Sequence, residues 1–111
     1  MIILFKTKKL QKRCNSLEEA RKKWGPVSGE KLMQRLDELD AADSLLDTLN
    51  LPGTYHALTG DRAGQWGVGL KHPMRLIFEP ADEPLPLLED DSLNIAAVKV
   101  VRILEIVDYH G

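Results

Sequence analysis

The sequence predicts an α+β domain, in which an N-terminal strand and helices pack on one face of a small, mainly antiparallel sheet. Apolar residues recur at helical spacing, with helix start and stop signals, through the first half of the chain. After Gly53 the apolar period changes to two, which is typical of strands. The last segment is apolar on both sides, as in an internal strand. A strand, then helices, then further strands favours helices on one side of a sheet.

Length and composition indicate one globular domain spanning residues 1–111. Apolar residues make up 43% and charged residues 29% of the chain, which is ordinary for a globular protein. The single Cys14 excludes an internal disulfide and a cysteine zinc cluster. No apolar run approaches 18 residues, and the apolar N-terminal run precedes the basic one, the reverse of a signal peptide. We therefore expect a soluble, cytoplasmic protein that does not enter a membrane.

The charges are unevenly distributed along the chain. Residues 1–36 hold ten Lys and Arg against three acids, whereas residues 37–54 and 80–98 each carry five acids and no Lys or Arg. The basic third forms either solvated helix faces or a surface for a polyanion or an acidic partner. The overall pI near 5.9 argues against strong nucleic-acid binding by the chain alone.

The first half of the chain contains a strand and two short helices. Ile2–Phe5 is a short, apolar run that favours a strand. Lys8–Cys14 has room for two helical turns. Ser16 begins a capping box for the next helix. That helix is expected to end at Trp24, before the stop signal Gly25-Pro26.

A longer helix and a turn complete this half. Ser28 is expected to cap the helix, and Leu32, Leu36 and Leu39 give it a buried stripe. A short turn follows and ends near Asn50.

The pattern in the second half of the chain predicts strands at 55–58, 65–70 and 75–78, joined by turn residues. If the second connection is the three-residue loop 72–74, Leu70 faces Leu76 and Val68 faces Phe78. The opposite face of this hairpin then carries Gly67, Gly69, Lys71, Arg75 and Ile77. The two glycines would leave a flat floor where a large partner could approach the backbone.

The last strand is predicted at 98–107, after an acidic, proline-containing loop at 80–91. An internal strand would hold Asp108, Tyr109 and His110 at a fixed sheet edge. Together with Arg75 and His56, these residues could cleave RNA without a metal. That reaction needs a base, an acid and a cation against the charge that grows on the phosphorane. The alternative is a set of ordinary polar residues at strand ends.

Other chemistry is not indicated. The sequence has no Gly-rich phosphate loop, no Gly-x-Ser-x-Gly and no metal-spaced His pair, so we expect no cofactor and no metal. The run 60–64 has the residues of a turn, from which Arg62 could point at a partner.

Three stretches of the sequence together resemble one family: LNLPG at 49–53, HALTGDRAGQWGVGLKHPMRLIFEP at 56–80 and ILEIVDYH at 103–110. The chain resembles the HigB-type toxins, or plasmid-maintenance killer proteins, of the RelE/ParE superfamily. The resemblance covers nearly the whole chain and implies a RelE-like fold.

The resemblance also implies function and partners. It implies the toxin of a type II toxin–antitoxin system, an endonuclease that cuts mRNA in the ribosomal A site and so inhibits translation. It implies a cognate helix-turn-helix antitoxin of the HigA type. Operator DNA is expected to be bound only through the toxin–antitoxin complex.

The family's site residues correspond to five positions. Arg75 would bind the phosphate, Asp108 and His110 would transfer protons, Tyr109 would stack on or orient the RNA, and His56 belongs to the same set. Thr59 departs from the family pattern, which has a lysine at this position. Lys71 is a candidate substitute, and Arg62 and Lys71 are candidate RNA-binding residues.

Two other interpretations stay open. The chain could be a ParE-like toxin or a catalytically inactive relative that acts only by binding a protein. It could also be a regulatory partner of another protein or of operator DNA, although no helix-turn-helix pattern is present. The segment 80–98 also departs from the compact toxins.

Overall fold

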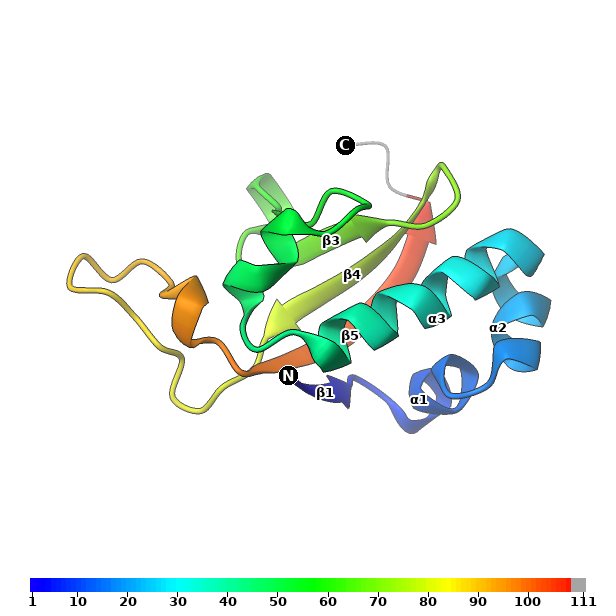
Figure 1. Cartoon of the computed structure of the whole chain (residues 1–111), viewed down its shortest axis with the longest axis horizontal. Helices are drawn as coiled ribbons and strands as arrows, with labels where there is room; N and C mark the ends of the chain where they lie inside the picture. The colour runs from blue at the N-terminus through cyan, green and yellow to red at the C-terminus, as the bar shows by residue number, and fades with distance from the viewer. Residues whose placement is uncertain (109–111) are drawn as a thin grey trace.

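The computed structural model describes residues 1–108. Its five strands form one sheet in the order β1 (Ile2–Phe5), β5 (Val100–Asp108), β4 (Met74–Pro80), β3 (Trp66–Gly69) and β2 (His56–Ala57). Only β1 and β5 run parallel, and the other neighbours are antiparallel. The helices lie on one side of the sheet (Figure 1). The predicted fold class is confirmed.

Local sequence signals set the helix boundaries. The helices are α1 (Lys8–Cys14), α2 (Leu17–Trp24) and α3 (Pro26–Ala41). The hydroxyl of Ser16 accepts a hydrogen bond of 3.2 Å from the backbone N–H of Glu19, as expected of a cap.

The expectation that Ser28 caps the third helix is wrong. The helix begins at Pro26 and leaves Ser28 buried inside it. Proline suits the first helical position, because its fixed φ matches the helix and it has no N–H to satisfy.

The β3–β4 hairpin keeps the predicted faces, but its predicted register is wrong by two residues. Val68 faces Leu76 and Trp66 faces Phe78. The N–H of Leu70 donates to the carbonyl of Met74, at 2.9 Å. This bond closes a loop at 71–73 rather than 72–74. Since side chains alternate between the two faces, a shift of two residues moves none of them to the other face.

The predicted open glycine floor is also wrong. A Cβ placed on Gly67 would lie 3.4 Å from Cδ2 of Leu58 and 3.5 Å from Cδ1 of Ile77. A Cβ on Gly69 would lie 3.3 Å from the carbonyl oxygen of Gly53. These glycines make room for neighbouring segments of the same chain: Gly67 is buried, and Gly69 is only partly exposed.

The remaining elements are short. Three 3-10 turns, η1 (Leu45–Asn50), η2 (Gly60–Arg62) and η3 (Ile95–Ala97), occupy connections. The last strand begins at Val100, two residues later than predicted, because η3 precedes it. It lies between β1 and β4, as expected of an internal strand. Its register against β4 shifts at a bulge beside Ile77.

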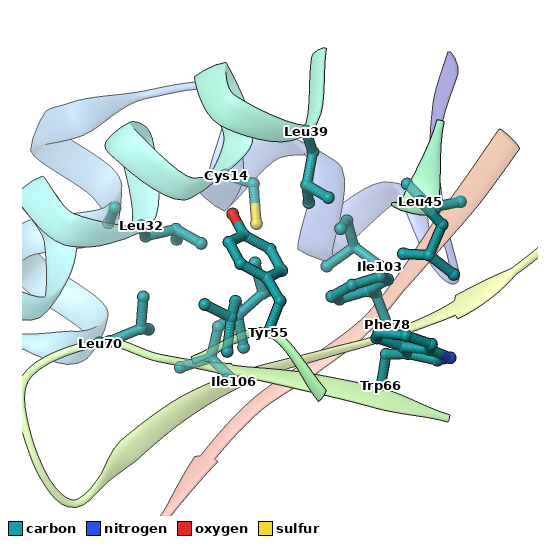
Figure 2. Close-up of a cluster of buried hydrophobic side chains, with 14 of the residues drawn as sticks. Cys14, Leu32, Leu39, Leu45, Tyr55, Trp66, Leu70, Phe78, Ile103 and Ile106 are labelled. Carbon is teal, nitrogen blue, oxygen red and sulfur yellow. The ribbon is translucent and has the colours of Figure 1, made fainter. Parts of the chain in front are cut away.

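The core fills the space between the helices and the sheet (Figure 2). Leu32 and Leu39 of α3 are fully buried, as are Phe78 of β4 and Ile103 of β5. Tyr55 packs edge-on against Phe78, with ring centroids 6.2 Å apart. No helix within residues 1–108 is long and apolar enough to cross a membrane.

Candidate functional site

A cavity of about 560 Å³ lies where the first half of α3 approaches the strands β2 to β4. Residues from three elements line it: Lys31 from α3, His56 from β2 and Arg75 from β4. The complete lining is Lys31, Arg35, Pro52, Gly53, Thr54, His56, Gly69, Leu70 and Arg75. Two of the sequence-predicted residues, His56 and Arg75, are therefore brought to one cavity.

The backbone before β2 orients the imidazole of His56. Nδ1 lies 2.9 Å from the carbonyl oxygen of Thr54. Because a carbonyl only accepts, Nδ1 carries the proton in this bond and Nε2 of the neutral ring keeps its lone pair. Thr54 has φ +60°, which is uncommon for a β-branched residue. Strain of this kind costs on the order of 1–3 kcal/mol and is often found at functional sites.

Arg75 is held by strands on both sides. It pairs with Gly69 on β3 and with Val107 on β5, and it is half-buried. Within residues 1–108 its guanidinium forms no ion pair. Arginine keeps its charge at any physiological pH, so the cavity contains a fixed cation that an anion can approach.

A buried network forms the wall behind the cavity. Nε of Arg35 donates to the carbonyl of Gly69 at 3.0 Å, and Nη1 pairs with Glu38 at 3.2 Å. Tyr55 donates to Oε1 of Glu38 at 2.8 Å. Burial, and then the bond to Glu38, raise the pKa of the Tyr55 hydroxyl well above its usual value. Gly53 has φ +96°, which favours glycine, and a Cβ there would lie 2.6 Å from the guanidinium of Arg35.

Sequence reasoning missed the two residues that α3 contributes to the cavity. Lys31 and Arg35 stand four residues apart, a spacing that puts both on one face of a helix. Arg35 is buried and paired, whereas Lys31 is half-buried and forms no ion pair within residues 1–108. The i, i+4 spacing of two bases was the available signal.

The C-terminal residues of the predicted site are described only in part. Asp108 ends β5, is exposed, and lies opposite Met74, the residue before Arg75. It is not among the residues that line the cavity. Tyr109 and His110 lie outside the described residues.

The other predicted RNA-binding residues lie apart from the cavity. Nη1 of Arg62 contacts Gln65 at 3.0 Å and Glu105 at 3.4 Å. Lys71 is exposed in the β3–β4 loop, and Thr59 is exposed just before η2. Neither lines the cavity. The residues 1–108 hold no group of three or more His, Cys, Asp or Glu arranged to bind a metal.

The fold is that of small α+β proteins with a helical layer on one side of a mainly antiparallel sheet. A solved structure with this fold is the YoeB/ParE toxin from Agrobacterium tumefaciens, with a TM-score of 0.61. The match covers 99% of this chain and 100% of that one, at 11% sequence identity. At this identity the likeness establishes a shared fold.

The sequence comparisons were negative. No family model matches the sequence. A search of the curated proteins also found no match.

Proposed function

We propose that this chain is the toxin of a type II toxin–antitoxin system and acts as a ribosome-dependent mRNA endonuclease of the HigB type. The main support is the meeting of His56 and Arg75 in one cation-lined cavity. The fold shared with a YoeB/ParE toxin and the sequence motifs at 49–80 and 103–110 support it further. The proposed partners are a HigA-type antitoxin, the ribosome and the mRNA in its A site.

The proposed reaction is an internal transesterification of RNA. The 2′-oxygen attacks the adjacent phosphorus, the bond to the 5′-oxygen breaks, and a 2′,3′-cyclic phosphate and a free 5′-hydroxyl result. A base takes the 2′-hydroxyl proton, and an acid gives a proton to the leaving 5′-oxygen. Arg75 stabilises the negative charge that builds on the equatorial oxygens.

The proton transfers are assigned by chemistry and by the sequence motif. Asp108 and His110 are the proposed acid and base, and Tyr109 is proposed to stack on the RNA. His56 is a further candidate base, because its Nδ1 contact with Thr54 leaves Nε2 able to accept a proton. An imidazole serves either role near neutral pH.

One observation supports the alternative function of a toxin that acts only by binding a protein. The position before Gly60 carries Thr59, which is exposed and provides no cation. A toxin that only binds a protein, in the manner of ParE, or an inactive relative, would not need one. Cleavage assays distinguish this alternative from the endonuclease.

We expect growth arrest when the chain is expressed alone, and relief when its antitoxin is expressed with it.

Arg75 gives a separate test. On ribosomes programmed with mRNA, Arg75→Ala should lower the cleavage rate by about 10²–10³, the effect of removing one electrostatic stabiliser. Because Arg75 is half-buried and forms no ion pair within residues 1–108, the melting temperature should change little.

The control is Arg102→Ala. Arg102 lies on the same sheet but pairs with Glu79 at 2.8 Å and does not line the cavity. Its variant should cleave at nearly the wild-type rate. Equal cleavage by wild type and Arg75→Ala would contradict the role proposed for Arg75. Growth arrest without any cleavage by wild type would contradict the endonuclease assignment and favour the binding-only toxin.

A further inference from the structure

The cavity contains a cation that neither the sequence motifs nor the fold comparison assigns to any task. Lys31 comes from α3, a helix whose other face packs on the sheet through Leu32 and Leu39. Lys31 is half-buried and lines the same cavity as Arg75 and His56. Three separate elements of the fold thus contribute residues with nitrogen-bearing side chains to the lining of one cavity.

The electrostatics of this cavity differ from those of the rest of the sheet. No Asp or Glu is among its lining residues. Two other arginines are paired with acids, Arg102 of β5 with Glu79 and Arg62 of η2 with Glu105. Arg35, the remaining cation at the cavity, is already paired with Glu38. Lys31 and Arg75 therefore carry the uncompensated positive charge of this cavity within residues 1–108.

The cavity is larger than a single anion needs. A volume of about 560 Å³ is in the range of small-molecule pockets, roughly 300–1,000 Å³. Pro52 and the glycines Gly53 and Gly69 form a wall with little polar side-chain surface. Such a space suits a sugar or base beside a charged group.

We propose that this cavity is a binding site for one nucleotide unit of an RNA strand, with Lys31 and Arg75 as the two ligands of its phosphate. The proposal deepens the proposed function, because it names the substrate group and adds Lys31 to the site. Two cations from separate elements can both bind one phosphate, and charge-assisted bonds of this kind are about twice as strong as neutral ones. The occupant is a phosphodiester in a strand rather than a free phosphate.

The test measures binding without cleavage. A 2′-O-methyl RNA trinucleotide, which cannot be cut, is titrated into the labelled chain and followed by NMR. We expect shift changes at Gly53, Thr54, His56 and Gly69. Lys31→Gln should weaken binding about tenfold, the effect of one charged hydrogen bond. It should also reduce the slope of log K against log salt by about 0.7, the value for one phosphate contact on a single strand.

The controls separate the site from general charge. Lys99→Gln removes one exposed positive charge outside the cavity and should leave affinity nearly unchanged. Lys31→Arg should restore most of the binding. Inorganic phosphate, titrated in parallel, should bind more weakly than the trinucleotide.

Three results would overturn the proposal: no binding by the wild-type chain, equal losses in Lys31→Gln and Lys99→Gln, or inorganic phosphate binding as tightly as the trinucleotide. Its failure is distinguishable from failure of the proposed function. Binding at the cavity without mRNA cleavage on ribosomes would sustain the nucleotide site and refute the nuclease. Cleavage of mRNA at the same rate by wild type and Lys31→Gln would sustain the nuclease and refute the nucleotide site.

Discussion

At the scale of single residues, the arginines of the sheet differ in their neighbours. Arg102 and Glu79 are directly opposite each other on neighbouring strands, and their side chains pair at 2.8 Å. Arg75 lies on β4 beside Gly69 and Val107, neither of which carries a charge. Partly exposed pairs contribute only about 0–1 kcal/mol to stability. Their larger effect here is on binding, since a paired arginine attracts an anion less strongly.

Cys14 gives a residue-scale prediction about pH. Burial raises the pKa of its thiol from 9.0 to about 12. The unfolded thiol ionises first, so the free energy of unfolding should fall as the pH rises above 9 and through the folded-state pKa. The expected loss between pH 9 and 10 is about 1 kcal/mol. Burial and Glu38 also raise the pKa of Tyr55, which adds a loss of the same sign at higher pH.

Urea denaturation at pH 8, 9 and 10 measures this effect. The control is Cys14→Ala, which removes the thiol and should show a flatter profile than wild type over this range. Parallel profiles for the two proteins would show that the thiol ionises equally in the folded and unfolded chains.

At the scale of elements, the helix pair α2–α3 depends on one glycine. Gly29 lies in the first turns of α3, where a Cβ would be 2.8 Å from the backbone nitrogen of Arg21 and 3.1 Å from the carbonyl carbon of Ala20. Backbone atoms cannot rotate aside as a long side chain can. The two helices therefore approach each other at a distance that only glycine permits.

Gly29→Ala tests this close approach. In an exposed helix the change would stabilise by about 1 kcal/mol. Here the clash should reverse the sign, and we expect a net loss of about 1–3 kcal/mol, typical of overpacking. Chemical denaturation measures it, with Val27→Ala as the control on an exposed neighbour. A more stable Gly29→Ala protein would contradict the packing of α2 on α3.

At the scale of the whole molecule, the sheet joins the two ends of the described chain. Ile3 of β1 pairs with Val101 of β5 in parallel, and β5 then pairs with β4 (Figure 1). The segment between β4 and β5 extends to one side and carries exposed leucines, including Leu85, Leu87 and Leu88. The residues of β1 and β5 are far apart in the sequence, and bringing them into contact costs chain entropy. The pairing of β1 with β5 therefore depends on the whole domain.

Hydrogen exchange tests this dependence. We expect the slowest amides in β5 and β4, around Ile103 and Phe78, because both strands have neighbours on each side and fully buried side chains. These amides should exchange only by global unfolding. Residues 83–91 should exchange much faster. Rates in β5 as fast as those of this segment would contradict the internal position of the strand.

The sequence by itself determined the local features. A short run with room for two helical turns predicted α1, and the cap at Ser16 and the stop at Gly25-Pro26 placed α2, because a cap is a bond between residues three apart. Period-two alternation assigned the faces of β3 and β4. The tertiary structure alone decided the hairpin register, the covering of Gly67 by Leu58 and the meeting of Lys31 with Arg75. In the sequence, Lys31 and Arg75 are separated by the rest of α3 and by the strands β2 and β3. Only packing brings them to one cavity, and no local pattern in the chain encodes that packing.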